Sequence, residues 1–181
     1  RSILVSISLK GKEGSKPYDI KISDIIHNKP IVISDRQSLP CDDGIYHFVE
    51  SKKNTDWDNS KATSFDNRHN ISHRARFKAD NQFNFFQDEI IQSSSQGIIL
   101  SVGCGTFFWD SKLSTSNPII PLDVSSHMLK EGIKKGRTKF GFCADATDLP
   151  FSDNQFDIVY CIDGLPGEFY HGTQSQVIRK K

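Results

Sequence analysis

The first quarter of the chain alternates apolar and polar residues over short stretches. Ile3, Val5, Ile7 and Leu9 each have polar neighbours, and similar short runs follow at 18–22, 31–33 and 45–49. Alternation with a period of two is typical of half-buried strands, and a turn signal at 42–44 precedes the last run. We therefore predict that residues 1–50 form a small β-rich module of three or four short strands. Such a module is too small to bury much core alone.

A polar segment and a long helix are predicted next. Residues 51–96 begin with a polar linker, and Ser72 is a plausible N-cap for a helix that runs to about Gln92. An apolar stripe is expected along that helix, formed by Phe77, Phe83, Phe85, Phe86 and Ile90. The stripe favours packing on a sheet over a role as a substrate-binding lid.

The second half of the chain alternates short apolar runs with helix-length segments. Strands are predicted at 98–102, 119–122, 140–144 and 156–161, and helices at 106–115 and from Ser125 or Ser126 to a C-cap at Gly136. Strands that alternate with helices pair in parallel. We therefore predict an α/β fold with a Rossmann-like parallel sheet and flanking helices over residues 97–181, preceded by the β-rich module.

Two glycines and one acidic residue around the first of these strands indicate a ligand site. The run 98–102 ends abruptly at Gly103 and Gly105, which let backbone approach a ligand because they carry no Cβ. Asp123 follows the second strand, twenty residues after Gly103. An acidic side chain there reaches ribose hydroxyls in nucleotide-binding βαβ units. The pattern predicts an adenosine-containing cofactor.

The composition limits the alternatives. With 23 basic and 22 acidic residues the net charge is +1, too small for a strong field that would attract nucleic acid. No run approaches the ~20 apolar residues of a membrane span, and residues 1–9 lack a signal-peptide pattern, so a cytoplasmic protein is expected. A first residue other than Met suggests a fragment. The four cysteines form no Cys-x-x-Cys pair, which favours free thiols over a metal site.

The order of the motifs resembles the class I S-adenosylmethionine-dependent methyltransferases, and most closely the ubiquinone/menaquinone C-methyltransferase group. The matching pieces are Ile-Leu-Ser-Val-Gly-Cys-Gly-Thr at 99–106, Leu-Asp-Val-Ser at 122–125 with Met128-Leu129, Asp-Ala-Thr-Asp-Leu-Pro-Phe at 145–151 and Phe-Asp-Ile-Val at 156–159. The family has a seven-stranded sheet, so the resemblance implies that this chain lacks strands five to seven. The fourth strand would then be an uncovered edge.

The resemblance also implies roles for individual residues. The residues expected to bind S-adenosylmethionine are Gly103, Cys104 and Gly105 under its methionine part, Asp123 on the ribose hydroxyls, Val124 and Met128 beside the adenine, Asp145 and Ala146 at the adenine amine, and Cys161 near the reacting methyl. No catalytic residue is named, because the sulfonium already activates the methyl group and the protein mainly aligns the reactants. The implied acceptor is a small molecule.

Two residues depart from the family pattern. Ser101 stands where the family usually has an acidic residue that contacts the cofactor, and Phe107 replaces the third glycine of Gly-x-Gly-x-Gly. Both favour an alternative in which the chain is a non-catalytic Rossmann-like module. A dehydrogenase is disfavoured because Phe108 stands where Gly-x-Gly-x-x-Gly requires glycine. A zinc-binding N-terminal domain is disfavoured because only Cys41 there could be a ligand.

Overall fold

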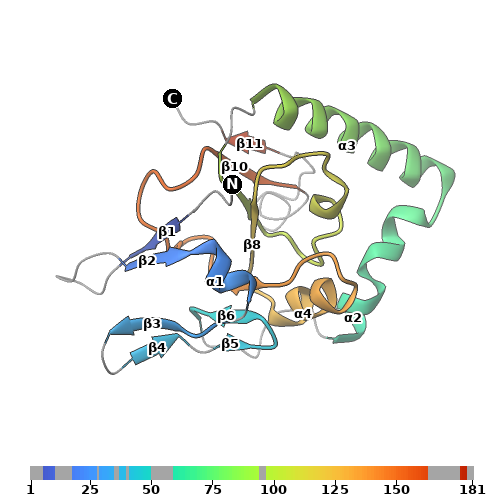
Figure 1. Cartoon of the computed structure of the whole chain (residues 1–181). Helices are drawn as coiled ribbons and strands as arrows, with labels where there is room; N and C mark the ends of the chain where they lie inside the picture. The colour runs from blue at the N-terminus through green and yellow to red at the C-terminus, as the bar shows by residue number, and fades with distance from the viewer. Residues whose placement is uncertain are drawn as a thin grey trace.

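A seven-stranded sheet forms the centre of the molecule (Figure 1). The computed structural model describes residues 6–10, 18–27, 29–34, 37–39, 41–49, 59–93, 97–162 and 176–178. The strand order of the sheet is β11–β10–β7–β8–β9–β6–β5. Its strands are β5 (Cys41–Asp42), β6 (Ile45–His47), β7 (Ile99–Val102), β8 (Ile119–Asp123), β9 (Gly141–Cys143), β10 (Ile158–Cys161) and β11 (Gln176–Ile178). β6 to β10 pair in parallel, whereas β5 and β11 pair antiparallel at the two edges.

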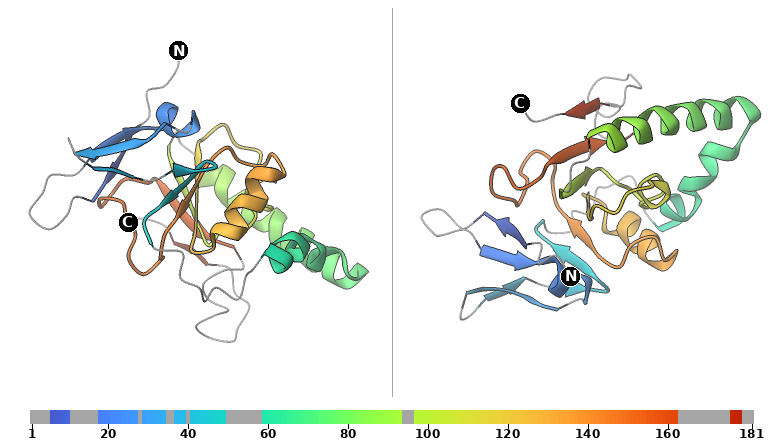
Figure 2. Two further views of the ribbon diagram at one scale, coloured as in Figure 1. Left: turned by 90° about the horizontal axis from the view of Figure 1, so that it is seen from below. Right: turned by 45° about the horizontal axis from the view of Figure 1, so that its top comes forward.

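Different elements cover the two faces of this sheet. On one face lie the helices α3 (His73–Ser93) and α4 (Ser126–Lys134). On the other face, one apolar core joins Leu100, Leu122 and Phe142 of the sheet to the N-terminal elements. These elements are β1 (Ser6–Leu9), β2 (Tyr18–Lys21), α1 (Ile22–Ile26), β3 (Ile31–Ser34) and β4 (Gln37–Leu39). Figure 2 shows this layered arrangement from two further sides.

The structure confirms the predicted fold class: a mostly parallel Rossmann-like sheet with flanking helices and a small N-terminal antiparallel part. The described residues of the N-terminal region contain more elements than expected, with six short strands and α1. Its last strand, β6, pairs with β9 of the parallel sheet. The turn before β6 has left-handed backbone at Asp43 (φ 50°) and Gly44 (φ 84°), as a tight hairpin between β5 and β6 requires. The proposed domain boundaries remain predictions.

The prediction of a helix at 106–115 is wrong. This segment consists of turns and a single short 3-10 helix, η2 (Asp110–Lys112). Phe107 has φ 56°, a left-handed conformation that an α-helix does not tolerate. Ser111, Ser114 and Thr115 add to this, because Ser and Thr are weak helix formers.

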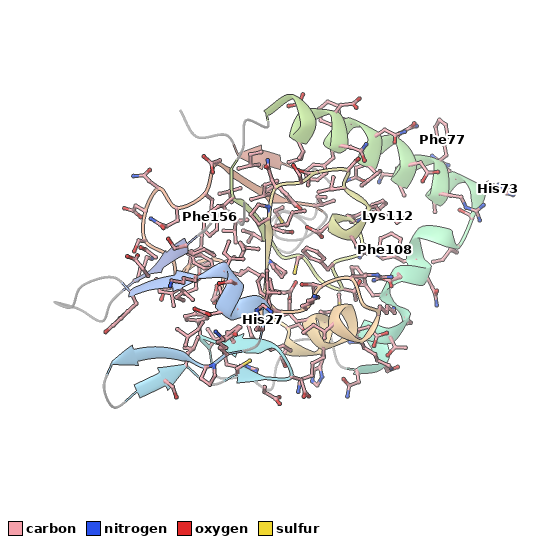
Figure 3. The ribbon with its side chains drawn as sticks, in the orientation of Figure 1. His27, His73, Phe77, Phe108, Lys112 and Phe156 are labelled. Atoms are coloured by element: carbon pink, nitrogen blue, oxygen red, sulfur yellow. The ribbon has the colours of Figure 1, made fainter. Side chains whose placement is uncertain are left out.

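The predicted stripe on α3 is correct at Phe86 and Ile90 and wrong at Phe77 and Phe85. Phe86 and Ile90 are 3% and 1% exposed and pack against the sheet, whereas Phe77 and Phe85 are 69% and 68% exposed. Figure 3 shows Phe77 pointing away from the molecule. The buried face repeats at Ala79, Phe83, Phe86 and Ile90, a spacing of three and four residues, and Phe83 stacks on Trp109.

The fourth parallel strand is not an uncovered edge in this structure. β11 pairs antiparallel with β10, joining Val159 to Ile178 and Cys161 to Gln176. Ile3 and Val5 of the first predicted strand lie outside the described residues. Within the described residues, no helix combines the length and apolarity needed to cross a bilayer.

Candidate functional site

The glycine bend, residues 103–106, connects β7 to the loop above it. All four residues of β7 are buried, and the chain then turns through left-handed backbone at Gly103 (φ 64°) and Gly105 (φ 56°). Glycine adopts this conformation without steric cost. The amide of Cys104 donates to the Leu122 carbonyl at 3.1 Å, which fixes the bend to the neighbouring strand β8. The bend therefore lies at the carboxyl ends of two parallel strands, where open α/β sheets bind ligands.

Gly105 is enclosed from two sides. A Cβ at this position would lie 3.0 Å from Cε of Met128 and 3.6 Å from the Phe65 ring. Met128, expected beside the adenine, is 3% exposed, and Val124 is 46% exposed. The Phe65 ring comes from the segment before α3, where sequence reasoning expected only a linker. An isolated aromatic residue in a polar stretch was the one available signal.

The Asp123 carboxylate connects the end of β8 to the glycine bend. Its Oδ2 accepts from the Gly105 amide at 2.8 Å, and its Oδ1 accepts from the Ser125 amide at 2.8 Å. Burial raises the pKa of the Asp123 carboxyl, while the N–H groups of Ser125, Gly105 and Val124 lower it. A carboxylate oxygen can accept more than one hydrogen bond. Asp123 therefore keeps capacity to accept further hydrogen bonds.

Asp145 and Ala146 follow the next strand, β9. The register pairs Asp123 with Cys143, so Asp123 and Asp145 leave neighbouring strands at the same edge of the sheet. Asp145 is exposed, and its Oδ1 accepts from the amide and the hydroxyl of Thr147 at 2.8 and 2.7 Å. These bonds form a local turn that fixes the carboxylate in its own loop.

A hollow of about 460 Å³ opens beside this loop. Leu100, Val159, Phe151 and Phe156 form its apolar part, and its lining includes Ala146. The glycine bend and Asp123 are not in its lining. The structure thus brings Gly103–Gly105, Asp123 and Met128 into one contact network and places Ala146 at a separate hollow.

Two cysteines at this edge, Cys104 and Cys143, have raised pKa values. Burial raises the pKa of the Cys104 thiol well above its usual value, and Asp123 and Asp110 add to this. Burial also raises the pKa of Cys143 to about 11. Cys161 is half-buried at the end of β10, and none of the four cysteines forms a disulfide. Cys104 and Cys143 are therefore thiols rather than thiolate nucleophiles at neutral pH, which is consistent with a backbone role for Cys104.

A buried carboxyl group lies next to Ser101. The Tyr160 hydroxyl donates to Oδ1 of Asp110 at 2.5 Å, and the Ser101 hydroxyl is a second donor to this carboxyl. Asp110 and Ser101 are 5% and 2% exposed, and burial raises the pKa of Asp110. Sequence reasoning noted that Ser101 replaces an acidic residue. It could not foresee that a later loop returns an acidic side chain to that place.

The comparisons with known proteins concern the same part of the chain. Residues 100–167 match the family described as methyltransferase domain. A demethylmenaquinone methyltransferase of Staphylococcus carnosus is 43% identical over 73 residues, which cover 36% of this chain and 30% of that protein. An uncharacterised protein of Methanocaldococcus jannaschii is 34% identical over 82 residues, which cover 45% of this chain and 35% of that protein. The chain thus matches about a third of the length of these relatives.

The matched segment contains the glycine bend, Asp123 and the loop after β9, and it forms the central part of the parallel sheet. These sequence matches and the observed sheet agree with each other. Residues 100–167 are therefore similar to methyltransferase domains, both in sequence and in the parallel sheet that they help to form.

Proposed function

We propose that the protein transfers a methyl group from S-adenosylmethionine to a small-molecule acceptor. The observation that carries this proposal is the hydrogen bond from the Gly105 amide to the Asp123 carboxylate. It unites the glycine bend with the acidic residue that the family resemblance assigns to the ribose. A ligand held by this pair would lie at the carboxyl ends of β7 and β8.

The residues present fit the cofactor. Gly105 leaves room where a Cβ would stand 3.0 Å from Met128, and Asp123 combines partial exposure with further acceptor capacity. Gly103, Cys104 and Gly105 would hold the methionine part, and Asp123 would accept from the ribose hydroxyls. Val124 and Met128 would flank the adenine, Asp145 and Ala146 would meet its amine, and Cys161 would lie near the methyl group.

The bound cofactor would supply a methyl group activated by its sulfonium. The chain's own residues would bind the nucleoside, orient its tail along the bend and exclude water from the acceptor side. No side chain is assigned as a general base, because an acceptor that loses no proton in the transfer step needs none.

A small-molecule acceptor and a cytoplasmic location are parts of the same proposal. The Staphylococcus carnosus relative is a demethylmenaquinone methyltransferase, and demethylmenaquinone is a small molecule. The nearly balanced charge of this chain gives no support for a nucleic-acid acceptor.

Calorimetry tests the proposal. Titration with S-adenosylmethionine or its demethylated product should show micromolar binding. Asp123→Asn should weaken it by roughly tenfold or more, since one lost charged hydrogen-bonding group is worth about 1.5–3 kcal/mol. Asp148→Asn is the matched control, because the Asp148 side chain is 89% exposed.

A second candidate, a non-catalytic Rossmann-like module, is favoured by one observation. Phe107, at the place of a family glycine, is buried and left-handed (φ 56°). Absence of binding heat at millimolar nucleoside would support this candidate and contradict the first.

A further inference from the structure

The side chain of Asp66 is the centre of a buried ion-pair cluster. Asp66 lies in the 3-10 helix η1 (Phe65–Asn70) and is 9% exposed. Its Oδ1 accepts from the Thr106 hydroxyl at 2.6 Å, and its Oδ2 accepts from Lys135 Nζ at 2.7 Å and Arg137 Nη2 at 2.6 Å. Burial alone would raise the pKa of Asp66, but the donors from Arg137, Lys135 and Thr106 lower it to about 2. The carboxylate is therefore charged at neutral pH.

The cluster acts directly on the glycine bend, because Thr106 follows Gly105. Arg137 Nη1 donates to the Thr106 hydroxyl at 2.9 Å and to its carbonyl at 3.2 Å, while the same hydroxyl donates to Asp66. Thr106 is fully buried. A Cβ on Gly132 of α4 would lie 2.8 Å from the Thr106 carbonyl, so the helix backbone also touches this residue. Thr106 is thus held by side chains from two segments and by α4.

A strap, formed by α2 (Asn59–Ser64) and η1, brings Asp66 to this place. Figures 1 and 2 show α2 beside α4. Ala62 of α2 is 1% exposed, and Oδ1 of Asn59 lies 2.8 Å from Nδ1 of His127 at the start of α4. The Phe65 ring lies on the Gly105 side, with the Arg68 guanidinium 3.7 Å from its centroid. The strap therefore lies against the bend and is anchored through Asn59 and Asp66.

The strap precedes residues 100–167, so the family match does not include it. We propose that Asp66 is a positioning residue for the cofactor: it holds Thr106, and through it the glycine bend, in the form that receives the methionine part. This inference rests on the proposed function. A bend held in its binding conformation before the ligand arrives lowers the entropic cost of binding.

A comparison of two ligands separates this role from general stabilisation. S-adenosylmethionine has the amino-acid tail that the bend would hold, whereas 5′-methylthioadenosine lacks this tail and keeps the nucleoside. Asp66→Asn should weaken the binding of S-adenosylmethionine about 2- to 30-fold, which is the range for residues that act without touching the ligand. The affinity for methylthioadenosine should stay within about twofold of the wild-type value. An equal loss for both ligands would overturn the proposal.

The control is Asp42→Asn, which removes an ion pair to Lys130 of α4 and whose side chain is 58% exposed. It should leave both affinities unchanged. Arg137→Lys keeps the charge but loses the two-pronged contact with Asp66 and Thr106, and it should repeat the selective loss. The proposal would also be overturned if both Asp66→Asn and Arg137→Lys bound S-adenosylmethionine with the wild-type affinity.

Trp109 provides a readout that does not depend on any ligand. The chain has two tryptophans, so Trp57→Phe leaves Trp109 alone, 8% exposed and stacked on Phe83. Asp66→Asn should shift its emission to longer wavelength in the folded protein, because the loop after the bend loosens, and Asp42→Asn should not. If wild type binds neither nucleoside, the proposed function fails, and the Trp109 shift alone decides whether Asp66 holds the bend. An unchanged emission would contradict it.

Discussion

Tyr160 donates its hydroxyl hydrogen to the buried Asp110 carboxyl at 2.5 Å, which joins β10 to the loop that follows the glycine bend. Ser101, the register partner of Tyr160, completes the group. The resemblance to class I methyltransferases implies an acidic residue at position 101, and here Ser101 instead donates to the Asp110 carboxyl. The loop that replaces the expected helix therefore has a defined task, because it brings Asp110 to the sheet.

Tyr160→Phe should destabilise the protein by about 1–3 kcal/mol, since it leaves a buried carboxyl with one donor fewer. Urea unfolding would measure this change. Tyr18→Phe, on the partly exposed strand β2, is the control and should stay within about 0.5 kcal/mol. Equal stabilities for Tyr160→Phe and wild type would show that the hydrogen bond contributes nothing net.

Because the pKa of Asp110 is raised, its contribution to the free energy of unfolding should depend on pH. The carboxyl is protonated in both states below its unfolded pKa of 3.8, whereas above it the unfolded chain releases the proton first. Asp110 therefore lowers the free energy of unfolding as pH rises from about 4 towards its native pKa. Asp110→Asn should remove this fall, which unfolding curves at several pH values would reveal. A variant with the wild-type pH dependence would contradict the assignment.

Asp66 should have the opposite effect. Its native pKa of about 2 lies below the unfolded value of 3.8. Asp66 therefore contributes its full stabilisation to the folded state above about pH 4, and this stabilisation is lost as pH falls towards 2. The difference corresponds to about 2 kcal/mol. Asp66→Asn should be less stable than wild type at pH 6 by about this amount and should approach it in acid. Unfolding at pH 6 and at pH 2.5 measures the stability difference between wild type and Asp66→Asn at each pH. An equal difference at the two pH values would contradict the prediction.

Phe107 offers a test of backbone strain. Alanine normally stabilises a chain relative to glycine, but at φ 56° the order should reverse. Phe107→Gly should be more stable than Phe107→Ala by about 1 kcal/mol, while both lose the burial of the ring. Thermal unfolding of the pair is sufficient, because the ring is absent from both variants. An alanine variant that is equally stable would mean that the bend relaxes.

Phe85 and Phe86 are neighbours on α3 with opposite environments, 68% and 3% exposed. Phe86 packs edge-on against Tyr160 with ring centroids 4.6 Å apart. Phe86→Ala should cost about 3–5 kcal/mol, and Phe85→Ala should stay within about 0.5 kcal/mol. Similar losses of stability in both variants would mean that α3 is rotated differently about its own axis.

Some of these features could be predicted from the sequence. The continuous apolar run at 99–102, the turn at 103–105 and the N-cap at Ser125 are local patterns, and the structure has each of them. The rotation of α3 was only half correct, because five apolar residues compete for one face and only tertiary packing chooses among them.

The long-range parts of the site could not be predicted. Asp66 and Asp110 stand in sequences without a recognisable motif, and their importance comes from partners far along the chain, Arg137 and Tyr160. The predicted helix after the bend does not form because Phe107 has a left-handed backbone conformation, and the sequence contains no signal for that conformation. Glycine at 103 and 105 is a stronger signal, since few other residues suit such turns.

The parallel pairing of β6 with β9 has a consequence for the order of folding. During synthesis, residues 45–47 leave the ribosome long before Gly141, so β6 can pair only with β5 until most of the chain has emerged. Pairings between such distant segments form slowly. We expect the N-terminal region to reach its final position last, and the edge of β6 that later pairs with β9 to be a site of self-association in the nascent chain.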